Sequence, residues 1–250
     1  MPMSVAPGAL GMGSCYEATY CTTRMQAEQA LLTFDSGLSL VQADNAITSN
    51  GYRYAKALTD AVKSVQPLQT QLPAGNGLAV QLQQIAQIIQ VRAALGVQRQ
   101  IFFCGIGSFD THEGQLGPQS ALLATVSDAI ASFYNATVEL GVAKNVTTFT
   151  MSEFSRALQP NSANGSDHAW GSHHLVLGGG VQGGKMFGSF PTMALNGPDD
   201  SGGNGRWIPS TSTAQYAATM AKWFGVNPTQ MAAAFPSLSQ FKVQDLGFMG

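Results

Sequence analysis

The stretch "RQIFFCGIGSFDTHEGQ", residues 99–115, together with the segments that follow it, decides the fold predicted from this sequence. Its apolar beginning predicts a short strand over Arg99–Ile106. The run "GPQSALLATVSDAIASFYNATVELG", residues 117–141, predicts a long helix with Pro118 at its start and a glycine at its end. The β-branched run 145–151 predicts a second strand. This order indicates parallel strands joined by a right-handed crossover.

A third short strand is predicted in "HHLVLGGG", residues 173–180, after a polar loop from Ser152 to about Ser172. Ligands bind beyond the carboxyl ends of strands in open parallel sheets. The loop with Asp110 and His112 follows one predicted strand, and the polar loop follows the next. We therefore expect an α/β fold, a mostly parallel sheet flanked by helices, with both loops at one edge.

Helical patterns flank this region on both sides. Apolar periodicity predicts helices over residues 24–37, 52–65 and 78–96 before it, and over 213–225 and 228–235 after it. Residues 1–23 have no periodicity, and residues 181–212 are rich in Gly, Pro, Asp, Asn and Ser and are predicted to be mostly loop. Because no boundary between domains is evident, we expect one α/β domain over residues 1–250.

Composition excludes several classes of partner. Only 10% of the 250 residues are charged, against about a quarter in an average soluble domain, and the formal net charge is −2. This balance offers no electrostatic attraction for nucleic acid or for an anionic membrane. No apolar run approaches the roughly 18 residues of a spanning helix, and the N-terminus lacks the pattern of a signal peptide. A Cys15–Cys21 disulfide and two unpaired thiols remain alternatives.

Histidines and carboxylates cluster in the two polar loops. Three of the four histidines lie within seven residues of one another, and the fourth, His112, follows Asp110 by two positions. Imidazole and carboxylate groups are the ligands of zinc and manganese, and carboxylates also bind calcium. The candidate ligands are Asp110, His112, Asp167, His168, His173 and His174. The alternative is that the aspartates form turns and that the histidines are structural.

Two further features qualify this prediction. His173 and His174 are neighbours in a predicted strand, so their side chains should point to opposite faces and at most one should reach a shared ion. Arg156 follows a predicted strand and is a candidate for holding an anionic substrate oxygen. A structural pair between Glu153 and Arg156 is the alternative. No GxSxG motif occurs, and neither Ser108 nor Ser172 is marked as a nucleophile.

The motifs "GSFDTHEGQ", residues 107–115, and "TFTMSEFSRALQPNSANGSDHAWGSHHLVLGGGVQGGKMFG", residues 148–188, resemble a bacterial family called domain of unknown function 1501. The resemblance covers about residues 80–226. Members are similar to sulfatases of the alkaline-phosphatase superfamily and typically carry G-G-F/W-D-T-H, S-E-F-G-R, D-H-G or D-H-W, and a Gly-rich G-G-x-x-G-G. The resemblance implies a sheet with metal ions at its carboxyl edge, and a periplasmic or exported protein.

The family's motifs can be matched to this sequence one by one. By this match the ligands of one ion resemble Asp110, His112 and one of His173 or His174. Asp167 and His168 resemble the Asp–His pair of a second ion. The sequence departs from the pattern at two positions. Ser155 stands where the family has glycine, and Ala169 stands where the family has glycine or tryptophan. It also has no match to the family's early strand, Asp and nucleophile, so it resembles the C-terminal half of such a protein.

The function implied by the resemblance is a metal-dependent hydrolase of phosphate, sulfate or related esters. Zinc or manganese, with calcium as the alternative, would activate a water molecule. Asp167 and His168 would serve as further ligands or general base, and Arg156 would steady a small anionic ester substrate. The competing hypothesis is a non-catalytic metal-binding or assembly protein with a vestigial site. A homo-oligomer is also expected, because half of a fold would leave open sheet edges.

Overall fold

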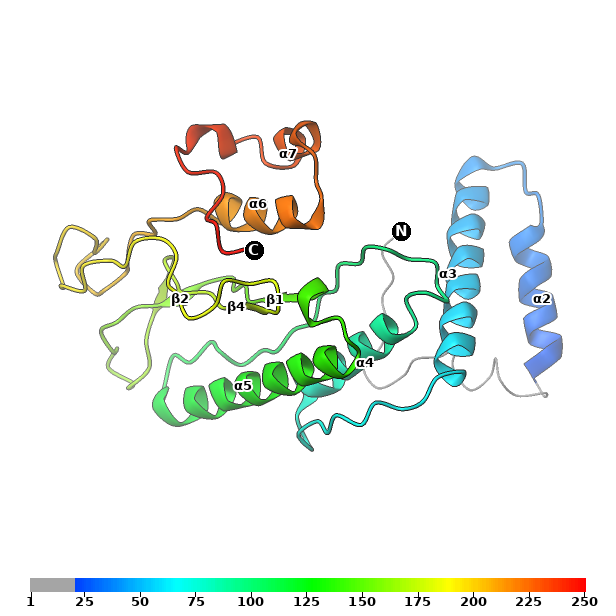
Figure 1. The fold of residues 1–250 in the computed structure, drawn as a ribbon, viewed down its shortest axis with the longest axis horizontal. Coiled ribbons are helices and arrows are strands. Elements are labelled where there is room, and N and C mark those ends of the chain that lie inside the picture. The colour runs from blue at the N-terminus through cyan, green and yellow to red at the C-terminus, as the bar shows by residue number, and fades with distance from the viewer. Residues whose placement is uncertain (1–20) are drawn as a thin grey trace. The chain divides into compact units, whose positions relative to one another are not determined.

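The computed structural model describes residues 21–250, and the chain divides into two compact units, residues 1–105 and residues 106–250 (Figure 1). Cys15, and with it the question of a Cys15–Cys21 disulfide, lies outside the described residues. Among the described helices, none has the length and apolar character needed to cross a membrane.

The first unit contains the helices α2 (Thr22–Thr33), α3 (Ser39–Lys63) and α4 (Gly77–Gln90). Helices α2 and α3 lie side by side (Figure 1), and the hydroxyl of Tyr52 on α3 donates a hydrogen bond to Glu28 on α2. All three predicted helices are present. The second helix is longer than predicted: it begins at Ser39 and continues through Gly51. A glycine inside a helix costs about 1 kcal/mol, and the residues around Gly51 offset this cost.

Helix α4 supplies most of the core of this unit. The side chain of Asn76 caps its N-terminus by accepting a hydrogen bond from the N–H of Ala79 at 3.0 Å. Leu78, Leu82 and Ile89 of its apolar stripe are buried, and the end of the helix packs against α3. The packed cluster consists of Leu58, Ala61, Ile88 and Val91, with Val62, Val65, Leu95 and Phe102 around it. The amphipathic pattern read from the sequence therefore faces a core.

The second unit begins with the long helix α5 (Leu116–Glu139), which confirms the helix predicted over residues 117–141. Pro118 lies in the first turn, where its missing N–H breaks no helical bond. Gly141 follows the helix with φ of 67°, the left-handed conformation that ends many helices. A short 3₁₀ helix, η2 (Ala143–Asn145), leads from there into strand β1.

The strands of the second unit form two separate antiparallel pairs. Strand β1 (Thr147–Phe149) pairs with β4 (Val176–Gly178), and Thr148 lies opposite Leu177. Strand β2 (Ser155–Arg156) pairs with β3 (His168–Ala169). Both sheets have two strands.

This sheet arrangement shows that the predicted fold class, a mostly parallel sheet flanked by helices like that of a sulfatase, is wrong. Residues 99–106 are not a strand, and Ile101 and Phe103 are 79% and 97% exposed. Within the run 145–151 only Thr147–Phe149 form a strand, and this strand, β1, pairs with β4 in the antiparallel direction. A strand–helix–strand order implies a parallel sheet only if the two strands share a sheet, and a short apolar run cannot establish that.

Two capped helices close the second unit. Helix α6 (Thr213–Phe224) has a capping box between Ser212 and Gln215, and α7 (Pro228–Ala234) has one between Asn227 and Gln230. A last 3₁₀ turn, η3 (Leu238–Gln240), follows. The hydroxyl of Tyr216 on α6 donates to carbonyl oxygens beside the β1–β4 pair, which joins this helix to the sheet.

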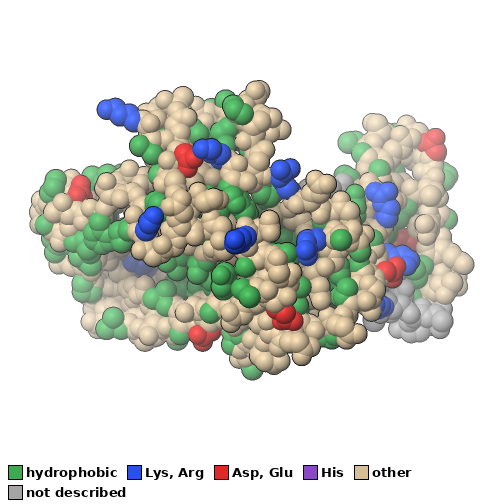
Figure 2. All heavy atoms as spheres, in the orientation of Figure 1, with side chains coloured by type: hydrophobic (Ala, Val, Ile, Leu, Met, Phe, Trp, Pro, Cys, Tyr) green, Lys and Arg blue, Asp and Glu red, His purple; other side chains and the backbone are tan. Residues whose placement is uncertain are grey.

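Residues 181–212 contain no helix and no strand longer than isolated bridges, as predicted. On the face of the molecule shown in Figure 2, charged side chains are few and scattered rather than gathered into a patch of one sign. Uncharged polar side chains and backbone therefore supply most of the hydrogen-bonding groups on that face.

Candidate functional site

Two polar loops of the second unit, residues 110–115 and 161–168, are joined by backbone hydrogen bonds. The bonds are Gly114 N–H to the Ala163 carbonyl at 3.1 Å, Gln115 N–H to the Asn164 carbonyl at 3.0 Å and Ser166 N–H to the Thr111 carbonyl at 3.2 Å. An isolated bridge pairs Glu113 with Asn164. Side chains that are about fifty positions apart in the sequence therefore meet at a fixed register.

Gly165 and Asn161 allow the two loops to approach so closely. A Cβ on Gly165 would lie 2.0 Å from the carbonyl carbon of His112, so only glycine fits at this position. The side-chain Nδ2 of Asn161 donates to the carbonyl of His112 at 2.9 Å. Its Oδ1 accepts hydrogen bonds from the N–H groups of Ala163 and Gly165, each at 3.0 Å. Asn161 thus holds its own loop in shape and fastens it to the other.

Three polar side chains converge on one oxygen atom of Asp110. Its Oδ1 lies 2.7 Å from Nε2 of His168, 3.0 Å from Nε2 of His112 and 2.9 Å from Nη1 of Arg156. The two imidazole Nε2 atoms lie 3.1 Å from each other. Asp110, His112 and His168 each offer a ligand atom within 4.8 Å of the others, which makes them a candidate site for one cation.

The surroundings of Asp110 favour its ionised form. The hydrogen bond from His168 lowers the pKa of the Asp110 carboxyl most, and the hydrogen bond from Arg156 and the charges of the two histidines lower it further. Partial desolvation opposes this shift. The carboxylate is therefore ionised at neutral pH, the state in which it binds a cation.

Arg156 is held in place by several acceptors. Its Nε donates to Oγ of Ser166 at 3.0 Å, and its Nη2 donates to the Ser166 carbonyl. The guanidinium side chain is only 11% exposed, and its Nη1 is bonded to Asp110. Oγ of Ser166 in turn donates to Oε1 of Gln115 at 2.5 Å. Arg156 therefore positions Asp110, and among the ion pairs of the described chain it has none with Glu153.

Phe154 orients His168. The two rings are stacked with centroids 4.0 Å apart and planes 4° apart. The guanidinium of Arg156 lies 5.5 Å from the centroid of the same phenyl ring. Strands β2 and β3 set this arrangement, because their register places Arg156 opposite His168. Phe154 lies inside the S-E-F-x-R motif, but no pattern in the sequence marked it as a site residue.

Asp167 lies on the other side of His112. Its Oδ1 is 3.7 Å from Nδ1 of His112 and 3.4 Å from Nδ2 of Asn161. Its Oδ2 is 3.9 Å from Nη2 of Arg206, whose Nε donates to the carbonyl of His168 at 3.3 Å. Asp167 thus faces Nδ1 of His112 while Asp110 faces Nε2, and a proton on Nδ1 would leave the Nε2 lone pair free for a cation. Arg206, which no sequence motif singled out, is the second guanidinium of the site.

His173 and His174 are not part of this cluster. The ring of His173 stacks on Phe190 at 4.9 Å between centroids, and the ring of His174 stacks on Tyr216 at 5.7 Å. Burial, followed by the charge of His173, lowers the pKa of His174. Burial also raises the pKa of Tyr216 to about 12. Of the six candidate ligands, the structure brings together Asp110, His112 and His168, sets Asp167 beside them, and leaves this pair of histidines in aromatic contacts.

The donor set of the cluster fits a borderline divalent cation. Two imidazoles and one carboxylate are typical ligands of zinc and also suit manganese. Tetrahedral zinc with bonds of about 2.0–2.2 Å holds its ligand atoms roughly 3.3–3.6 Å apart. The ligand atoms of Asp110, His112 and His168 lie 2.7–3.1 Å apart. All three side chains are about half exposed, so a small outward movement accommodates the ion.

Comparisons with known proteins gave one match. Residues 22–243 match the family described as Protein of unknown function (DUF1501). No curated protein and no solved structure matches the chain.

Proposed function

The chain belongs to the DUF1501 family, and we propose that it is a metal-dependent hydrolase of phosphate, sulfate or related esters. The observation that supports this proposal is the convergence of Asp110, His112 and His168 on one point, with ligand atoms within 4.8 Å of one another. We assign these three residues to the cation, zinc or manganese. The bound cation would supply Lewis-acid catalysis and would acidify a water molecule at neutral pH.

The other residues of the site have separate roles in this proposal. Arg156 fixes the Asp110 carboxylate. Asp167 faces Nδ1 of His112 and is the candidate general base, since its carboxylate is half exposed. Arg206 donates from Nε to the carbonyl of His168, but its Nη2 has only a long contact to Asp167, at 3.9 Å. Its guanidinium is also more exposed than that of Arg156, so it is better placed to meet an anionic oxygen of the ester.

The relation to the sulfatase-like superfamily, and to the C-terminal part of such proteins, is a proposal that rests on the motifs at residues 107–115 and 148–188. The fold does not contribute to it, because the strands form two antiparallel pairs. The hydrolase proposal therefore depends on the side-chain cluster rather than on a shared sheet.

Elemental analysis of the purified protein, paired with turnover of aryl phosphate, sulfate and carboxylic esters, tests the proposal. We expect about one zinc or manganese per chain, which Asp110→Ala and His168→Ala lose together with turnover. His173→Ala is the matched control, because this histidine stacks on Phe190 away from the cluster and should keep both. Equal metal content in all four proteins would refute the metal site, and metal retention without turnover would refute the hydrolase.

A non-catalytic metal-binding protein is the second candidate. Two observations favour it: the ligand side chains are 49–57% exposed, and the hydroxyl of Ser166 is engaged with Gln115 rather than directed at the cluster. In this case zinc or manganese would raise the melting temperature of the wild type and of His173→Ala but not of His168→Ala, and none of the esters would be hydrolysed.

A further inference from the structure

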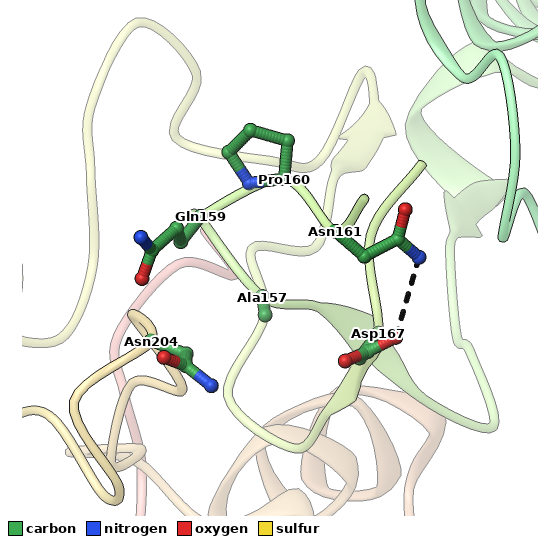
Figure 3. Close-up of a pocket in the computed structure, with 6 residues that line it drawn as sticks. All are labelled: Ala157, Gln159, Pro160, Asn161, Asp167 and Asn204. Carbon is green, nitrogen blue, oxygen red and sulfur yellow. Dashed lines mark hydrogen bonds between the residues drawn. The ribbon is translucent and has the colours of Figure 1, made fainter. Parts of the chain in front are cut away.

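A polar pocket of about 260 Å³ opens beside Asp167 (Figure 3). It is lined by Ala157, Gln159, Pro160, Asn161, Asp167 and Asn204. We propose that this pocket binds a neutral, hydroxyl-rich group of about the size of one sugar ring, which is the alcohol portion of the ester substrate. This inference rests on the proposed function, because it assigns a substrate class to the same site.

The walls of the pocket are fixed by backbone hydrogen bonds. These are Ala157 N–H to the Asp167 carbonyl at 2.8 Å, Leu158 N–H to the Gly205 carbonyl at 3.1 Å and Gln159 N–H to the Asn204 carbonyl at 3.0 Å. Asp200 holds the loop that carries Asn204, because its Oδ1 accepts hydrogen bonds from the N–H groups of Gly205 and Arg206. The pocket is therefore formed before any ligand arrives, which reduces the entropy lost on binding.

Gly205 is required for this close contact between the two walls. Its φ is 74°, and a Cβ at this position would lie 2.4 Å from Cβ of Leu158. Only glycine meets both conditions. The neighbouring residue Asn204 is thereby placed across the pocket from Asp167, and Figure 3 shows the amide of Asn204 turned toward that carboxylate.

The polar groups of the pocket match hydroxyls. The side-chain amides of Gln159 and Asn204 have no hydrogen-bond partner in the described part of the chain. Each amide offers two donor hydrogens and an acceptor oxygen, and the Asp167 carboxylate offers acceptors alone. Adjacent hydroxyls both donate and accept, so a diol can donate to Asp167 and accept from Asn204. The pocket is smaller than the roughly 300–1,000 Å³ of sites for drug-sized ligands, which suits a single ring.

The charges around the pocket favour a neutral group over an ion. An anionic group would lie against the Asp167 carboxylate, which lines the pocket. The guanidinium of Arg206, 3.9 Å from that carboxylate, offsets its charge and so reduces the attraction for an ammonium group. Asp167 also connects the pocket to the cluster, since its Oδ1 is 3.7 Å from Nδ1 of His112. An alcohol held against Asp167 would therefore lie one side chain away from His112, a ligand of the proposed cation.

Saturation-transfer NMR on the full chain, with methyl glucoside and glycerol as probes, tests the binding step. We expect transfer from the protein to methyl glucoside, and a dissociation constant that rises about five- to tenfold in Asn204→Ala, through the loss of one or two hydrogen bonds. Asn135→Ala is the matched control, because this exposed residue on α5 does not line the pocket. Absence of transfer, equal affinity in Asn204→Ala, or preferential binding of ethylammonium or acetate would overturn the inference.

Turnover then separates this inference from the proposed function. If the enzyme hydrolyses esters, Asn204→Ala should lower kcat/KM about five- to tenfold for glucose 6-sulfate and leave that for p-nitrophenyl sulfate unchanged. Equal losses on both substrates would overturn the pocket assignment. Methyl glucoside binding that depends on Asn204, in a protein that hydrolyses neither ester, would support the pocket and refute the hydrolase.

Discussion

Replacement of Gly165 by alanine is the most direct test of how the site is built. The new Cβ would lie 2.0 Å from the carbonyl carbon of His112, 2.1 Å from its oxygen and 2.4 Å from the backbone nitrogen of Glu113. All three are backbone atoms, so no flexible side chain can move aside. The φ of Gly165 lies outside the left-handed region, which means that the penalty comes from contact alone and not from backbone strain.

The size of the effect follows from the required movement. To reach the 3.4 Å at which ordinary van der Waals contact begins, the two loops must separate by about 1.4 Å from their 2.0 Å contact. That movement breaks the three backbone hydrogen bonds between the loops and the bond from Asn161 to the carbonyl of His112. At about 0.5–1.5 kcal/mol each, the loss is about 2–6 kcal/mol of unfolding free energy, and His112 moves away from His168.

Denaturant unfolding and zinc titration measure the two consequences of Gly165→Ala. Gly51→Ala is the matched control: Gly51 lies inside α3, is followed by Tyr52 rather than by proline, and has nothing within 4 Å of its Cβ position. Alanine there should stabilise the protein by up to about 1 kcal/mol, because it restricts the unfolded chain and favours helix. If Gly165→Ala unfolds at the wild-type midpoint and binds zinc with wild-type affinity, the loop pairing does not hold the site and the reasoning fails.

Two further predictions concern the rest of the chain. Hydrogen bonds from Lys222 and from the N–H of Gly247 lower the pKa of Asp245, so its contribution to stability should be present at neutral pH and be lost as the pH falls through its lowered folded-state value. Asp245→Asn should therefore lower the free energy of unfolding by about 0.5–1 kcal/mol at pH 7, a small value because the Lys222–Asp245 pair is exposed. This difference should vanish in acid. A difference between the two proteins that stays constant across pH would contradict the prediction. Phe103 is 97% exposed in an extended apolar run, so we expect the protein to self-associate and Phe103→Ser to weaken that association in light-scattering measurements. A strictly monomeric wild type would rule out this prediction.

Local patterns predicted the helices well because their signals are contained in the segments themselves. The apolar stripe and the Asn76 cap of α4, and the Pro118 and Gly141 boundaries of α5, act within a few residues. The strands were harder to predict because pairing depends on a distant partner. The apolar run 99–106 has the composition of a buried strand, but no other strand lies beside it in the described structure. The parallel sheet was inferred from element order, which does not determine pairing.

The two loops of the candidate site do meet, as expected, but the physical reason differs from the one that was predicted. The two polar loops were expected to meet because both would follow the carboxyl ends of parallel strands, and they meet although residues 21–250 form no parallel sheet. What joins them is the absence of a side chain at Gly165 and the amide of Asn161, which bonds to the other loop. Neither residue type carries a chemical signature in sequence, because glycine and asparagine are common in any turn. The histidines and carboxylates identify which loops hold the candidate ligands, whereas the small and uncharged residues between them determine whether those ligands converge.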